Sequence, residues 1–290
     1  MSADSAGRGS GVIHDIGYQR YTGPRLGRRH VVAALYVHGV RAAFGLGRSA
    51  KAKIFPGIVL GLAFAVAVVV VAIRSQTGEV VMNYLEYTDG LGIPVLLFLA
   101  VVAPELVCRD LRSRVLPLYF SRPLRRTDYA LAKLAAMITA VWLLLAGPLL
   151  LLFLGGAFAQ TDGASGAWQE FTDFLGGLGY AAMTAVVLGA VAVPLASLSS
   201  RRAVAAVIIV VAFLVTTPII GVLDAVGGTT AQQLASLLNP VTLLGGLQTW
   251  IYRTSVVDIG GYGPLYLAVA LGLVAGCVAA LIVRYRKVAA

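Results

Sequence analysis

Residues able to carry chemistry are sparse in this 290-residue chain, and they form no catalytic pattern. The sequence contains no G-x-x-x-x-G-K-[ST] loop for nucleotide phosphates, no G-x-S-x-G turn for a serine nucleophile and no H-E-x-x-H zinc motif. Cys108 and Cys277 lie at or within apolar runs, as buried thiols do, which indicates neither a disulfide nor a metal site. We therefore expect no enzymatic activity in this chain by itself, and no cofactor or metal ion bound to it.

Within the long apolar runs of the sequence, only Glu105 carries a charge. Ion-coupled carriers keep ionisable groups inside the membrane, where such groups are costly and functional. Arg109 follows Glu105 by four residues, the spacing of an ion pair along one helix face, and we expect a local salt bridge between them. Ion-driven transport and a membrane-embedded enzyme are therefore both disfavoured, and any energy source would lie outside this chain.

The composition indicates that lipid is the natural solvent of the chain. It is 59% hydrophobic and 12% charged, with a mean hydropathy of +0.86, whereas soluble domains carry about 25% charged residues. Continuous apolar runs predict helices rather than the alternating strands of a membrane barrel. We expect an all-α integral membrane protein with six spans: Ile54–Ile73, Leu91–Val107, Met137–Phe158, Leu175–Leu198, Ala203–Val222 and Pro264–Val283.

The charges of the segments between these spans alternate in sign. The segment before the first span, the second and fourth loops and the tail (residues 284–290) carry net charges of +7, +5, +2 and +3, whereas the first, third and fifth loops carry −2, −3 and −1. Positive segments stay in the cytoplasm. We therefore expect both termini in the cytoplasm of a bacterial cell, the six-helix domain (residues 54–283) in its plasma membrane, and no nucleic-acid partner.

Two segments precede the first span. Residues 1–27 have no apolar core and no usable motif, and we expect a cytoplasmic N-terminal segment. Residues 28–53 predict an amphipathic helix in the cytoplasmic interface, with His38, Arg41 and Arg48 as its site residues. Histidines also bind metals, but no Cys or carboxylate cluster accompanies these, and a solvated polar face is favoured.

The connection before the sixth span, residues 224–262, is too apolar for a free loop. Pro240 would interrupt a helix, so Asn239 and Pro240 are expected to separate two short helices. Two interpretations remain open. The pair either re-enters the membrane from the outside or forms a surface hairpin that covers the outer side.

The most informative connection is the second loop, residues 109–133. Its first residues predict a short amphipathic helix from Arg109 to Leu116, ended by Pro117. Thr127 is a plausible N-cap, and Asp128 suits the first turn of the helix that becomes the third span. Such a loop is either a rigid knob under the membrane or an ordinary basic loop that determines topology.

Over about thirty residues this loop resembles the first cytoplasmic loop of ABC-2 type permeases, the membrane subunits of type V ABC exporters. That family commonly shows an acid ending the second span, an Arg-Asp pair, a Leu-rich short helix and S-x-P-x-x-R/S-x-x-Y-x-x-x-K leading into the third span. The family layout, with an interface helix, six spans and an outside helix pair, also agrees with this chain. The matching residues are Glu105, Arg109, Asp110, Leu116, Leu118, Ser121, Pro123, Arg126, Tyr129 and Lys133.

The resemblance implies a division of labour between subunits. Two permease subunits, copies or relatives, would form the export pathway within membrane lipid, and two separate ATPase subunits would bind ATP and Mg²⁺ on the cytoplasmic side. The interface helix would be a second contact with the ATPase. The coupling helix seated in the ATPase would contribute Arg109, Asp110, Leu111, Arg112, Ser113, Val115 and Leu116.

A function of another class fits the same residues. The chain could be a non-transporting membrane scaffold or assembly protein whose basic loop recruits an ATPase or lipid. Export and scaffolding both require the six spans and the basic loop, so the residues alone leave this alternative open.

Overall fold

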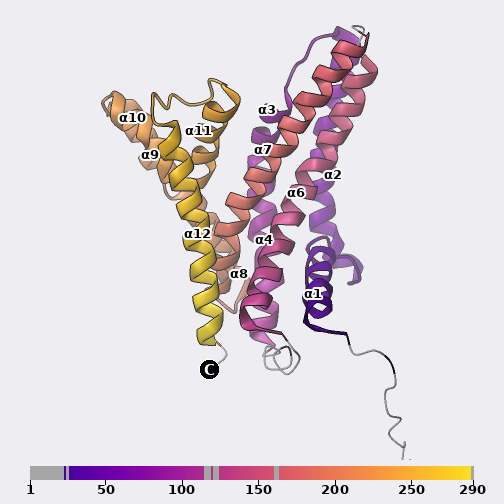
Figure 1. Ribbon diagram of the computed structural model, residues 1–290, viewed down its shortest axis with the longest axis vertical. Helices are drawn as coiled ribbons and strands as arrows, with labels where there is room; N and C mark the ends of the chain where they lie inside the picture. The colour runs from indigo at the N-terminus through magenta and orange to yellow at the C-terminus, as the bar shows by residue number, and fades with distance from the viewer. Residues whose placement is uncertain (1–22, 24–25, 114–118, 120–123, 160–162, 289–290) are drawn as a thin grey trace, which may run out of the picture.

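The computed structural model describes residues 23, 26–113, 119, 124–159 and 163–288, and the regular structure in that part of the chain is entirely helical (Figure 1). The C-terminal end of α12 and the helix α1 lie at one end of the molecule, called the terminal end below, and the C-terminal end of α6 lies at the opposite, distal end. The helices are α1 (Arg28–Ala43), α2 (Ala50–Thr77), α3 (Tyr84–Gly90), α4 (Gly92–Arg112), α6 (Arg126–Ala159), α7 (Gly163–Ser197), α8 (Arg202–Leu214), α9 (Thr217–Val226), α10 (Thr229–Ala235), the 3₁₀ turn η1 (Ser236–Leu238), α11 (Pro240–Tyr252) and α12 (Gly263–Val288).

Six membrane-length apolar helical segments occur among the described residues, which confirms the predicted all-α class and the number of spans. The helices are longer than the apolar runs alone indicate. α6 and α7 have 34 and 35 residues, or about 51 Å at 1.5 Å per residue, against a hydrocarbon core of about 30 Å. The predicted third loop, residues 159–174, is therefore largely the first part of α7, and α12 continues through most of the predicted tail.

The fifth span, α8 and α9, is interrupted between Leu214 and Thr217. Pro218 accounts for the interruption, because it has no N–H to donate to the Leu214 carbonyl and its ring would collide with that carbonyl in a continuous helix. The predicted span Ala203–Val222 is confirmed as part of one membrane-length segment, Arg202–Val226, which contains this short interruption. The bend leaves backbone carbonyls that need other partners.

Asn239 supplies such a partner from the connection between α9 and α12. Its Nδ2 donates to the backbone carbonyl of Phe213 (2.6 Å) and to Oγ1 of Thr216 (3.0 Å), while its Oδ1 accepts from the Val241 backbone N–H (2.8 Å). The same side chain therefore donates hydrogen bonds to the interrupted fifth span and caps α11. Asn239 and Pro240 do separate two short helical segments, as predicted, although Pro240 begins the second one.

The predicted amphipathic helix over residues 28–53 is wrong in its length. α1 ends at Ala43, because Gly45 and Gly47 have positive φ angles of 68° and 78° and turn the chain toward α2. A Cβ atom on Gly45 would also collide with the backbone of Ala52. Arg48 therefore lies in the turn after α1, not on the same helix as His38 and Arg41.

The core is built around α6, which packs against α1, α2, α7, α4 and α12. α1 approaches α6 closely at Gly39, where a Cβ atom would lie 2.7 Å from that of Ala136, and the Tyr36 hydroxyl lies 2.9 Å from Oγ1 of Thr139. A smaller apolar cluster joins α11 to α12 around Tyr266. The long helices thus form one packed body that connects the terminal and distal ends.

Candidate functional site

The residues of the second loop that the sequence singled out converge at the terminal end. Lys133 Nζ lies 2.8 Å from Asp110 Oδ2, and the Tyr129 hydroxyl donates to the same oxygen at 2.6 Å. Both Lys133 (5% of its side chain exposed) and Asp110 (13%) are withdrawn from solvent. Three residues of the family-like motif therefore connect the last turn of α4 directly to the first two turns of α6.

Aromatic rings extend this contact to α12. The Tyr129 ring lies 5.6 Å from the ring of Tyr119 and 5.2 Å from that of Tyr285, and Lys133 Nζ lies 5.4 Å from the Tyr129 ring centre. Arg126 donates to the backbone carbonyl of Arg286 at 2.8 Å. The start of α6 is thus held against the C-terminal part of α12 as well as against α4.

The embedded acid Glu105 forms a different pair from the one expected. Its carboxylate pairs with Arg48, from the turn after α1, and with Arg202, the first residue of α8. Arg109, its expected i+4 partner, forms no ion pair with another described residue, so that prediction is wrong. Tertiary packing brings two cations from other elements to the same carboxylate, which therefore joins α4 to both.

Asp128 joins α6 to α1. Its carboxylate makes two contacts of 2.6 Å with the Arg28 guanidinium and accepts the Arg125 backbone N–H at 3.2 Å. Thr127, the expected N-cap, lies inside α6, and the side chain that accepts an N–H from before the helix is Asp128. The prediction that Asp128 lies in the first turn is confirmed, whereas the prediction that Thr127 is the N-cap is wrong.

The proposed coupling helix from Arg109 to Leu116 is not a separate element where it is described. Arg109 to Arg112 form the last turn of α4, and the Ser113 hydroxyl donates to the Arg109 carbonyl at 2.7 Å. Leu111 packs on the core, whereas Arg109 and Arg112 are exposed. Val115, Leu116, Leu118, Ser121 and Pro123 lie outside the described residues.

A cavity of about 680 Å³ lies beside these residues, between α1, α4 and α6. Lys133, Asp110 and Glu105 line it together with Arg48, which was predicted on the interface helix. His38 also faces this cavity, whereas Arg41 is exposed on α1 and does not line it. We use the name terminal-end cluster for the charged residues at the ends of α4, α6 and α8 and in the turn after α1, together with Tyr129. Its members are Arg48, Glu105, Arg109, Asp110, Arg112, Tyr129, Lys133 and Arg202.

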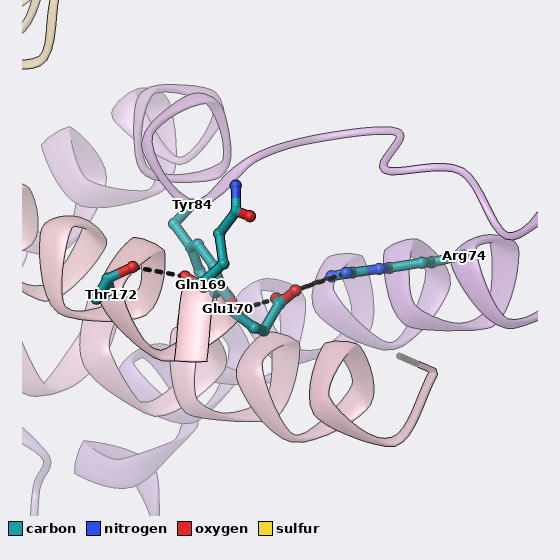
Figure 2. Close-up of polar contacts among 5 residues, drawn as sticks. All are labelled: Arg74, Tyr84, Gln169, Glu170 and Thr172. Carbon is teal, nitrogen blue, oxygen red and sulfur yellow. Dashed lines mark hydrogen bonds and ion pairs between the residues drawn. The ribbon is translucent and has the colours of Figure 1, made fainter. Parts of the chain in front are cut away.

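A second polar site, at the distal side, was missed by the sequence analysis. Arg74 of α2 makes two contacts with the Glu170 carboxylate of α7, at 2.9 and 2.6 Å, and the Tyr84 hydroxyl donates to Glu170 at 2.5 Å (Figure 2). Gly156 makes room for this pair, because a Cβ atom there would collide with both side chains. Burial and the bond to Glu170 raise the pKa of Tyr84, which keeps its hydroxyl protonated as a donor.

This distal site borders a cavity of about 390 Å³. The only sequence signal was that opposite charges occur in the first and third loops, which is too general to pair Arg74 with Glu170. None of the described residues forms a group of three His, Cys, Asp or Glu side chains placed to hold a metal ion.

No protein-family model matches this chain, and no curated protein sequence matches it.

Proposed function

We propose that the chain is the permease subunit of an ATP-driven exporter and that a separate ATPase subunit docks on its terminal-end cluster. ATP and Mg²⁺ would bind to that partner. The observation that carries the proposal is the buried contact of Asp110 with Lys133 and Tyr129. It makes the exposed end of α4 and the start of α6 one mechanical unit, so a push on one helix would move both.

The charges at this end suit an acidic or carbonyl-lined groove on a partner. Arg109 and Arg112 project from the last turn of α4 and form no ion pair with any other described residue, although the acids nearby are paired with other cations. Exposed arginines are enriched where proteins bind one another. They are therefore the first side chains that we expect an ATPase to contact.

A second permease subunit is part of the proposal. Only 28%, 22% and 17% of the apolar windows of α2, α8–α9 and α12 are buried within the chain, against 50–56% for α4, α6 and α7. These open faces contact lipid or another subunit. We propose that two such chains, copies or relatives, form the pathway between them and that the α10–α11 pair re-enters the membrane from the outside.

The test searches for an ABC ATPase gene beside the gene of this chain, co-expresses the two proteins and reconstitutes them in vesicles. We expect ATP-dependent efflux of a cargo and ATP hydrolysis that depends on the permease. Charge reversal by Arg109→Glu with Arg112→Glu should abolish binding of the ATPase and efflux together. Arg253→Glu, at an exposed residue after α11, is the matched control and should change neither.

Two outcomes would contradict the proposal in different ways. An ATPase that binds normally to the double arginine variant would remove the terminal-end cluster as its docking site. A stable complex that hydrolyses ATP but moves none of the tested cargoes would favour the scaffold alternative.

A further inference from the structure

A second cavity, of about 240 Å³, lies between the start of α4, the middle of α7 and α11. Most of its wall is apolar, with Val95, Leu99 and Leu244 among the residues that line it. Its polar end is formed by Asp89, the next-to-last residue of α3. The cavity therefore combines a largely apolar wall with one carboxylate. It belongs neither to the terminal-end cluster nor to the distal site.

Asp89 has no cationic partner among the described residues. The Tyr180 hydroxyl donates to its Oδ1 at 2.5 Å, but no Lys, Arg or His side chain comes within ion-pair distance. Besides burial, the charge that raises its pKa is that of another acid, Glu86. Every acid discussed above at the terminal and distal sites has a cation, so Asp89 differs from them in this respect.

Further polar side chains near this carboxylate are buried and incompletely bonded. Thr184 lines the cavity with 7% of its surface exposed, and Gln248 is 1% exposed. They approach Tyr180 and Asp89, respectively, but neither reaches full hydrogen-bond geometry. Buried polar groups normally have partners, so the Thr184 hydroxyl has bonding capacity to offer a ligand in the cavity, whereas Gln248 does not line it.

We propose that this cavity binds an amphipathic cation, a ligand with a protonated amine at Asp89 and an alkyl or aryl body against the apolar wall. An ammonium group would supply the missing counter-charge and donate several hydrogen bonds, whereas an anion would be repelled. A purely apolar ligand would fill the wall but leave the carboxylate without a partner, which is costly away from water. The volume suits roughly sixteen to twenty-four water-sized groups, at about 10–15 Å³ each.

The site is independent of the proposed ATPase partner, because it is formed by this chain alone. Binding is therefore measured on the purified full chain in nanodiscs of zwitterionic lipid, with radiolabelled octylammonium as the probe in a scintillation proximity assay. Unlabelled octylammonium, 1-octanol and octanoate are each added as competitors of the radiolabelled probe. These competitors share the same chain length in carbon atoms and differ in the charge of the head group.

We expect saturable octylammonium binding, with 1-octanol and octanoate about ten- to hundredfold weaker as competitors. Asp89→Asn should weaken octylammonium binding by a similar factor. Glu79→Gln, which removes an exposed acid from the connection before α3, is the matched control and should leave binding unchanged. Equal competition by 1-octanol would show an apolar lipid-tail site and overturn the proposal.

Saturable binding that is unchanged in Asp89→Asn would also overturn it, and so would the lack of saturable binding to the unaltered chain. The comparison of the three competitors uses the unaltered protein. It therefore decides the question even where Asp89→Asn does not fold.

Discussion

Lys133 and Asp110 form a buried ion pair, with Nζ and Oδ2 2.8 Å apart, that joins the end of one membrane helix to the start of the next. Each residue belongs to the segment that the sequence singled out, yet 22 intervening residues separate them along the chain. The pair holds the end of α4 against the start of α6. The exposed arginines of α4 are thereby held at a defined position relative to α6.

Removal of the cation from this pair should destabilise the protein strongly. Lys133→Met would leave the Asp110 carboxylate buried with only the Tyr129 hydroxyl as partner. The loss of one partner of a buried pair costs about 3–5 kcal/mol in free energy of unfolding. Thermal melting in detergent would show a large decrease in Tm, and the double variant Lys133→Met, Asp110→Asn should recover part of it.

The matched control for that variant is Lys51→Met, because Lys51 is exposed at the start of α2. A surface lysine contributes little to stability. Equal changes in Tm for the two lysine variants would contradict a structural role of the buried pair.

Asn239→Ala should loosen α11 and the break in the fifth span together. The variant loses the bonds to the Phe213 carbonyl and to Thr216 as well as the cap of α11, and loss of the cap alone costs about 0.5–2 kcal/mol. Hydrogen exchange should become faster in both α9 and the first turn of α11. Asn83→Ala removes a comparable cap from α3 and should accelerate exchange only there.

Glu170→Gln should destabilise the distal side, because it leaves the Arg74 guanidinium without its charge partner. Glu170 is 6% exposed, and the expected cost is again about 3–5 kcal/mol. Asp173→Asn is the same change one turn later, at an exposed residue without an ion pair among those described. A loss of stability as large in Asp173→Asn, measured by thermal melting, would argue against the Arg74–Glu170 pair as the cause.

Asp89 should make stability depend on pH. Burial raises the pKa of this carboxyl, against the opposing effect of the Tyr180 hydrogen bond. A pKa that is higher in the folded state means that the folded protein holds the proton more tightly, so stability is gained as the pH falls through the raised pKa and is lost as it rises. Asp89→Asn removes this contribution.

The measurement is the difference in Tm between the unaltered chain and Asp89→Asn at pH 7 and pH 5. Other titrating groups are common to both proteins, so the difference isolates Asp89. We expect the Tm of the unaltered chain to rise relative to that of the variant on acidification. A relative fall would show that the folded state favours the carboxylate form.

The solvent and the number of spans follow from the amino-acid sequence alone, because the backbone of about 20 consecutive apolar residues can be satisfied in lipid only as a helix. The helix break at Asn239 and Pro240 was also predicted from the sequence, and local chemistry suffices for these features. Asp110, Tyr129 and Lys133 were singled out by the resemblance of the second loop to ABC-2 type permeases. The extent of α1 was mispredicted because the two glycines that end it lie in a stretch otherwise compatible with a helix.

The pairing of the charges depends on tertiary packing. Glu105 had a plausible partner four residues away, but packing brings Arg48 and Arg202 to it, and Arg74 meets Glu170 across 96 residues of sequence. Pairing of distant charges depends on how helices cross, and helix crossing depends on close approaches such as that of α1 to α6 at Gly39. Hydropathy and loop charge contain no information about such contacts, since they describe each segment without its neighbours.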